Sequence, residues 1–236
     1  MVNALVLRAP TAMSAPGAAP RIVHPLLKSG AIRRYLASTS TVAAGSVAQT
    51  LTDLTGSGAT LSAATTGASP TMRESGAIRY LEFDGVNDRM DSSSGPTNAQ
   101  PLTLMVVGRF QGANKAAQIL TNLHANAGGR AISRTSGGFI QAGFPTGVTT
   151  TIAADNNWHV FTMVANGASS LAAMDSTSQT ADFGTGAAGG MTLGRNGDGV
   201  TFDTINIAEI IVWPTALTPT ERAAEIANLK AAHGIA

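Results

Sequence analysis

The sequence predicts an all-β protein: a two-sheet antiparallel sandwich with one short C-terminal helix and an extended N-terminal arm. Three observations support this class. Segments that fit short β-strands recur at regular spacing from residue 31 onward. A helix-like segment, residues 218–232, follows the last of them. Four prolines in the first 28 residues exclude a long helix or an interior strand there. We therefore divide the chain into an arm, residues 1–30, and one domain, residues 31–236.

The N-terminal arm is basic as well as rich in proline. Residues 1–52 contain five Arg or Lys residues and no Asp or Glu, although the whole chain carries a net charge of only +1. A basic arm on a mildly acidic body is typical of interaction tails. Because it lacks the dense cations and interleaved aromatic residues of nucleic-acid-binding segments, we expect it to dock on a neighbouring protein subunit. The expected interface residues are Leu5, Leu7, Arg8, Arg21, Ile22 and Leu26.

The body contains about a dozen candidate strands separated by turn-forming residues. Residues 102–110 are almost continuously apolar, which predicts a strand buried on both faces. Asn166-Gly167 is a dipeptide typical of β-hairpins. The candidate strands before the last are residues 32–37, 47–54, 78–83, 89–92, 102–110, 117–123, 130–134, 138–144, 158–166, 170–175 and 180–183.

The last strand and the helix carry the clearest local signals. Residues 204–213 (TINIAEIIVW) fit an apolar strand, and Pro214 ends it because proline lacks the N–H for the next rung of a ladder. Residues 218–221 (TPTE) then fit a helix start, with a capping threonine, a proline at the first helical position and a glutamate that reaches back to the cap. Gly234 lies where such a helix would end.

Four segments together resemble the concanavalin A-like (laminin-G-like) jelly-roll family. They are residues 81–88 (LEFDGVND), 157–164 (NWHVFTMV), 191–195 (MTLGR) and 207–235, which run from IAEIIVW to HGI. Their order along the chain is that of the family, and the matches span roughly residues 30 to 236. The resemblance implies a jelly-roll body. It does not fix the function, because this fold hosts lectins, glycanases, adhesion modules and virion proteins.

Groups that could carry catalysis are few. Glycosidases of this fold use two acidic residues that converge on a groove, whereas Glu209 lies alone among apolar residues of its strand. The chain has no Gly-x-Ser-x-Gly motif, and the lack of cysteine excludes a thiolate metal site, a disulfide and a cysteine nucleophile. Its four histidines do not have the local spacing of a metal pair. We therefore expect no enzymatic activity.

Calcium is the one cofactor that the sequence leaves open. Laminin-G-like modules sometimes bind it through Asp and carbonyl oxygens at a loop rim, and this chain has two Asx-rich turns. Asx residues in glycine-rich turns mostly bond local backbone N–H groups, so we expect a structural role and no cofactor, with calcium as the alternative. The candidate ligands are Asp84, Asn87, Asp88 and Asp91 in one turn, and Asn196, Asp198 and Asp203 in the other.

Composition and resemblance together favour an interaction protein. Charged residues make up 12% of the chain, about half the usual share, and Ala, Thr, Ser and Gly replace them, which suits packing against other copies. With the arm, this bias resembles phage virion proteins, so we expect a non-enzymatic capsid decoration or head- or tail-fibre component located in the virion. Its partners would be other virion proteins or copies of itself, with no specific nucleic acid and no membrane, since no run approaches the ~18 apolar residues of a membrane helix.

The alternative is a carbohydrate-binding, lectin-like module that contacts host surface glycans. Sugar binding needs an aromatic platform with nearby amides, and the chain has only two Trp and two Tyr. Trp158 and Trp213 lie in apolar strand patterns, which predicts that both belong to the core, each with a partner for its indole N–H.

Overall fold

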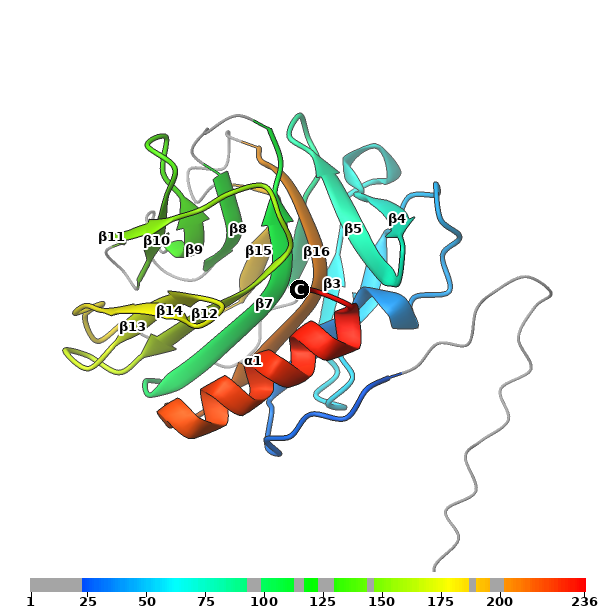
Figure 1. Ribbon diagram of the computed structural model, residues 1–236. Coiled ribbons are helices and arrows are strands. Elements are labelled where there is room, and N and C mark those ends of the chain that lie inside the picture. Colours follow the sequence, from blue (N-terminus) through cyan, green and yellow to red (C-terminus); the bar gives the residue numbers. More distant parts are fainter. Residues whose placement is uncertain are drawn as a thin grey trace, which may run out of the picture.

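The computed structural model describes residues 23–92, 99–112, 117–122, 130–143, 147–186, 190–195 and 202–236. Within these ranges, sixteen strands form two antiparallel sheets of eight strands each, and one α-helix lies outside them (Figure 1). The all-β sandwich with a single C-terminal helix is therefore confirmed. No helix in the described part of the chain is both long and apolar enough to cross a membrane.

The first sheet carries the helix on its outer face, and we call it the helix-side sheet. Its central strand is β16 (Thr204–Trp213), which pairs with β7 along one edge. Along the other edge, the first half of β16 pairs with β5 and the second half with β1 (Arg33–Leu36). The order of the sheet is β14 (Thr177–Thr180), β13 (Leu171–Met174), β12 (His159–Ala165), β7 (Leu102–Phe110), β16, β5 (Ile78–Asp84) and β4 (Thr71–Ser75).

The second sheet closes the other side of the sandwich. Several of its strands are short and polar, and the list of candidate strands did not include β3, β11 or β15. Its order is β11 (Val148–Ala153), β10 (Phe139–Ala142), β9 (Arg130–Arg134), β8 (Ala117–Asn122), β15 (Met191–Leu193), β6 (Met90–Ser92), β3 (Thr60–Ser62) and β2 (Thr50–Thr52).

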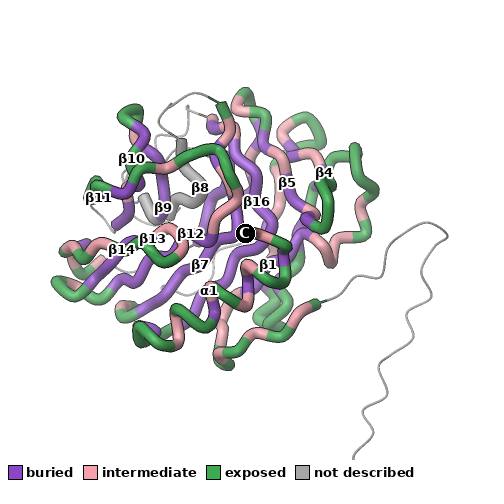
Figure 2. The backbone as a smooth tube through the Cα atoms, in the orientation of Figure 1, coloured by how far each residue is buried: buried purple, intermediate pink, exposed green. Residues whose placement is uncertain are grey.

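The main core lies between the sheets, and a second apolar cluster lies between the helix-side sheet and the helix (Figure 2). Strand β16 contributes to both. Ile207 and Ile210 belong to the main core, whereas Ala208 and Ile211 belong to the helix-side cluster. A β-bulge between Ile207 and Glu209 shifts the alternation, so Ala208 and Glu209 both lie on the helix side.

The helix α1 (Pro219–His233) has the predicted ends. Thr218 and Glu221 form a complete capping box, and Gly234 ends the helix in the left-handed region with φ 64°. Its buried stripe is Glu225, Leu229 and His233, one residue per turn, so two of its three members are polar. Polar side chains that are buried in this way, here Glu225 and His233, need hydrogen-bonding or ionic partners.

One predicted strand is displaced. The pattern placed a strand at residues 180–183, but β14 occupies Thr177–Thr180 and forms a tight hairpin with β13. The turn is Asp175-Ser176, and Asp175 adopts a positive φ of 51°. This pair lacks the glycine that usually marks such turns in a sequence, which explains the error.

Candidate functional site

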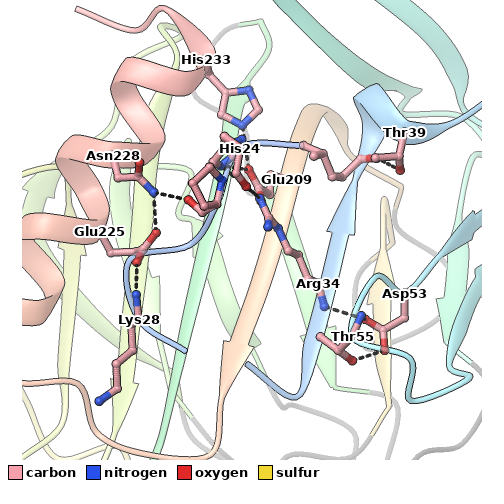
Figure 3. Close-up of polar contacts among 12 residues, drawn as sticks. His24, Lys28, Arg34, Thr39, Asp53, Thr55, Glu209, Glu225, Asn228 and His233 are labelled. Carbon is pink, nitrogen blue, oxygen red and sulfur yellow. Dashed lines mark hydrogen bonds and ion pairs between the residues drawn. The ribbon is translucent and has the colours of Figure 1, made fainter. Parts of the chain in front are cut away.

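The residues that precede β1 lie along α1 and are bonded to it (Figure 3). The backbone N–H groups of Leu27 and Lys28 both donate to Glu225 Oε2, each at 2.9 Å. Asn228 Nδ2 donates to the carbonyl oxygen of Pro25 at 3.0 Å. Residues 25–28, which we call the arm base, are thus held on the helix by hydrogen bonds between their backbone groups and side chains of the helix.

Of the six residues predicted for the arm interface, Leu26 is the one that lies in the described part of the chain. It is half-buried and packs against the helix-side cluster, which includes Trp213 and Leu229. The indole N–H of Trp213 donates to the carbonyl oxygen of Lys28 at 3.1 Å, as expected for a buried tryptophan. The remaining interface residues lie outside the described residues, and docking of the arm on a partner stays a prediction. They are Leu5, Leu7, Arg8, Arg21 and Ile22.

A buried polar cluster joins His24, which directly precedes the arm base, to β1, β16 and α1 (Figure 3). Arg34 Nε donates to Glu209 Oε1 at 2.7 Å, and its Nη2 donates to the carbonyl oxygen of His24 at 2.8 Å. The other carboxylate oxygen, Oε2, lies 2.8 Å from His233 Nε2 and 3.2 Å from His24 Nε2. Burial alone would raise the pKa of Glu209. The bonds with the two histidines and the charge of Arg34 outweigh burial and lower that pKa to about 2.

Two histidines and a glutamate are a donor set that can bind zinc, and these ligand atoms lie within 4.8 Å of one another. The position of Arg34 argues against a metal, because its Nη2 is 3.2 Å from His24 Nε2. A divalent cation there would leave an excess of buried positive charge beside a single carboxylate, which is strongly unfavourable. The cluster therefore serves as a polar lock between the two ends of the chain.

Sequence reasoning missed this cluster. Glu209 stands alone among apolar residues in the sequence, and none of the histidines is close to another. The fold brings His24 and His233 to it from opposite ends of the chain. One signal was available: a glutamate inside a long apolar strand needs a buried cationic or hydrogen-bonding partner.

The first calcium candidate is a self-bonded turn. Asp84 Oδ1 accepts the backbone N–H groups of Val86 at 2.8 Å and Asn87 at 3.2 Å. Asp88 Oδ2 accepts the backbone N–H of Asp84 at 3.0 Å. These contacts match the structural role of Asx turns. Calcium binding at this turn stays a prediction.

The other calcium candidates are scattered. Asp91 Oδ1 accepts the hydroxyl of Thr192 at 2.9 Å. Asp203 is buried, and its backbone N–H donates to the carbonyl oxygen of Gly194 at 3.0 Å. Asn196 and Asp198 lie outside the described residues.

Replacing Asp88 by asparagine should raise the free energy of unfolding by about 1–2 kcal/mol at pH 7.5. Burial raises the pKa of Asp88 to about 6, and the nearby charges of Asp84 and Glu82 add to this. A raised carboxyl pKa means that the fold favours the neutral form. Asp88 therefore destabilises the protein as the pH rises from about 4 through 6. Asparagine keeps the acceptor oxygen without the charge.

Urea unfolding at pH 3.5 and pH 7.5 tests this expectation. Wild type and D88N should be nearly equal at the lower pH and differ at the higher. A calcium-dependent rise in the Tm of wild type that D88N lacks would contradict the purely structural interpretation of Asp88.

A cavity of about 410 Å³ lies between α1 and the β12–β14 end of the helix-side sheet, and we call it the helix pocket. Three structural parts form it: the floor on β12 and β13, the turn and strand β14 of the hairpin, and one side of the helix. The residues that line it are Thr162, Ala173, Asp175, Ser176, Ser178, Pro219, Arg222, Ala223, Ile226, Ala227 and Lys230.

Next to the pocket, His159 lies between two carboxylates. Its Nδ1 is 2.8 Å from Asp175 Oδ2 and its Nε2 is 2.7 Å from Asp155 Oδ1. Burial lowers the pKa of His159, but the bonds with Asp175 and Asp155 outweigh burial and raise it overall. His159 therefore helps to hold the Asp175 carboxylate of the hairpin turn in place.

The two tryptophans differ in environment. Trp213 is fully buried, as predicted, whereas Trp158 is half-buried at the margin of the helix-side cluster. The Arg109 guanidinium carbon lies 5.1 Å from the Trp158 ring and 5.6 Å from the Tyr80 ring. Those two rings meet edge to face at 5.1 Å. Trp158, Tyr80 and Arg109 therefore form a partly exposed aromatic and cationic group that the sequence did not predict.

No family model matches the sequence, and no curated protein matches it. Solved structures with a similar fold include the Trypanosoma rangeli sialidase in complex with sialic acid (TM-score 0.59, 11% identity, 89% of this chain and 36% of that one). The binding domain of Paraclostridial Mosquitocidal Protein 1 is similar with a TM-score of 0.59 and 12% identity, over 83% of this chain and 51% of that one. The receptor-binding domain of botulinum neurotoxin type G is similar with a TM-score of 0.58 and 12% identity, over 84% of this chain and 51% of that one.

These comparisons concern the fold alone, because the identities are only 11–12%. They agree with the two-sheet β-sandwich described above. The chain spans about a third to a half of the length of the solved structures it matches.

Proposed function

We propose that this chain is a non-enzymatic binding and assembly module that forms part of a virion, as a capsid decoration or head- or tail-fibre component. It would dock on other virion proteins, or on copies of itself, through its N-terminal arm. The observation that carries this proposal is the arm base. Because residues 25–28 are bonded to α1 and β16, the preceding residues start from a fixed point on the body.

Composition and the buried cluster give further support. The low share of charged residues suits packing of many copies, in which repetition multiplies weak contacts. The buried carboxylate of Glu209 has both oxygens bonded, one to Arg34 and the other to the two histidines. A carboxylate held in this way is not available for acid–base chemistry.

Removal of residues 1–22, which leaves the arm base intact, should abolish incorporation into particles and leave the fold unchanged. The measurement is the amount of the chain in particles purified from a host that carries the altered gene, quantified by mass spectrometry, with Tm as the check on folding. A matched control replaces residues 1–22 by a glycine–serine linker of equal length. Particles that contain the shortened chain at the wild-type level, or wild-type particles in which the full-length chain is not found, would refute the proposal.

A second candidate function is glycan binding, and one specific observation favours it. Trp158 and Arg109 are partly exposed beside the buried Tyr80 ring, which gives an aromatic surface of the kind that sugar binding requires. Amide groups are also present on this sheet, where Gln111, just after β7, donates from Nε2 to Asn206 Oδ1 on β16 at 2.6 Å. The truncation above separates the two functions. A glycan-binding module that lacks residues 1–22 should keep its affinity on a glycan array, whereas an assembly protein loses its place in the particle.

A further inference from the structure

The helix pocket contains a buried hydroxyl that has no partner in the described part of the chain. Thr162 lies on the pocket floor, opposite Ala173 on the neighbouring strand, and is 1% exposed. Its Oγ1 makes no hydrogen bond. A buried hydroxyl without a partner destabilises a fold, so it is a group that a bound ligand can satisfy.

The pocket wall contains the guanidinium group of Arg222, and the structure gives it one hydrogen-bond acceptor among the described residues. Arg222 Nη1 donates to the carbonyl oxygen of Leu217 at 2.7 Å, and this bond holds the guanidinium in place. No carboxylate of the described residues lies within ion-pair distance of Arg222. The rest of the planar fork can therefore bind an anionic group, and a fork of this geometry fits a carboxylate in bidentate fashion.

The one carboxylate in the pocket does not neutralise Arg222, because other groups already hold it. Asp175 Oδ1 accepts the backbone N–H of Val160 at 3.0 Å. Its Oδ2 lies 2.8 Å from His159 Nδ1 and 3.4 Å from Lys230 Nζ. The pocket thus contains more positive than negative charge, which favours an anionic ligand.

The remaining lining sets the shape of the ligand. Ala173, Ile226 and Ala227 form apolar walls, and the exposed hydroxyls of Ser176 and Ser178 stand on the hairpin side. A volume of about 410 Å³ is within the range of small-molecule sites. These features suit a compact molecule with an anionic group, apolar faces and hydroxyls.

We propose that the helix pocket binds a hydroxylated carboxylate of the size of one acidic sugar residue, with its carboxylate on Arg222 and a hydroxyl on Thr162. This proposal names a ligand class for the glycan-binding function and rests on that function. It is independent of the arm, since none of the residues that line the pocket belongs to the arm base.

Isothermal titration calorimetry of the full chain with D-glucuronate tests the proposal. D-glucose, which lacks the carboxylate, and acetate, which lacks the hydroxyls, are the matched probes. We expect saturable binding of glucuronate and at least tenfold weaker binding of the other two. Arg222→Lys, which keeps the charge but not the fork, should weaken glucuronate binding at least tenfold.

Thr162→Val provides the decisive variant because its effects on stability and on binding should have opposite signs. Removal of the unpartnered hydroxyl should raise Tm by about 2–4 °C and weaken glucuronate binding at least tenfold. Thr150→Val is the control. Thr150 lies on the other sheet and is also buried, but its hydroxyl donates to Ile140 O at 2.8 Å and accepts from Ile152 N at 3.1 Å. That control should lower Tm and leave binding unchanged.

Three results would overturn the proposal: no binding of glucuronate by wild type, binding that T162V and R222K both leave unchanged, or a loss of Tm in T162V as large as in T150V. Glycan-array binding without glucuronate binding would count against the pocket but not against the glycan function. Glucuronate binding by a chain that lacks residues 1–22 should equal that of the full chain, which separates this test from that of the arm.

Discussion

Replacement of Glu209 by glutamine should lower the free energy of unfolding by about 3–5 kcal/mol at pH 7. The variant keeps the size of the side chain and removes its charge. Arg34, which is 7% exposed, would then be a buried cation without a counterion. His24 and His233 would lose their common acceptor at the same time. The measurement is urea unfolding followed by circular dichroism.

The effect should depend on pH with a definite sign. The pKa of Glu209 is lowered to about 2 in the fold. A carboxyl group whose pKa is lower in the folded protein stabilises the fold at any pH above its pKa in the unfolded chain. This stabilisation is lost as the pH falls toward the pKa of the folded protein. The difference in the free energy of unfolding between wild type and E209Q should therefore have its maximum value at pH 6 and decrease between about pH 4.5 and pH 2.

A matched control for this variant is Glu82→Gln. Glu82 pairs with Arg73 at 2.6 Å, and the Arg73 side chain is 47% exposed. Loss of such a surface pair should change the free energy of unfolding by less than about 1 kcal/mol. Adding Arg34→Met to E209Q removes the unpaired cation and should restore part of the lost stability. An E209Q effect no larger than that of E82Q would show that the polar lock does not hold the chain ends together.

Replacement of Gly194 by alanine should lower the free energy of unfolding by about 3–5 kcal/mol. Gly194 follows β15 with φ +76°, which strains any residue with a Cβ. An added Cβ would also overlap the Phe83 ring and lie 2.6 Å from the carbonyl oxygen of Asp88. Neither neighbour can move easily, because Phe83 is fully buried and the other atom belongs to the backbone.

Gly56→Ala separates the two causes. Gly56 has a similar φ of +81°, but an added Cβ would meet nothing within 4 Å. The Gly56→Ala control should lower the free energy of unfolding by about 1–2 kcal/mol, from backbone strain alone. Equal effects of the two variants would mean that close packing against Phe83 contributes nothing.

Local signals in the sequence were sufficient for the elements that depend on local chemistry. The capping box and the exit glycine defined α1 to within one residue, and the continuous apolar run of residues 102–110 defined β7. Four strands in the described part of the chain were not predicted: β3, β4, β11 and β15. They are short, polar or rich in threonine, and pairing with neighbouring strands rather than their own pattern makes them strands.

The candidate sites depend on contacts that no local pattern contains. Glu209 finds Arg34 and the histidines only after the sheet forms, and a bulge that the alternation does not reveal turns Glu209 toward the helix. The helix pocket likewise arises where α1 crosses a hairpin whose turn lacks the usual glycine. Long-range geometry, and not residue type, therefore decides where the charged groups meet.

The position of β16 in the helix-side sheet has a consequence for biosynthesis. This strand lies between β7 on one side and β5 and β1 on the other, yet it comprises residues 204–213 of 236. A nascent chain on the ribosome must therefore hold its earlier strands apart, with the facing edges of β7 and β5 open, until residues 204–213 have been synthesised. Products released before residue 204 would keep both edges open, which makes premature termination a direct source of aggregation.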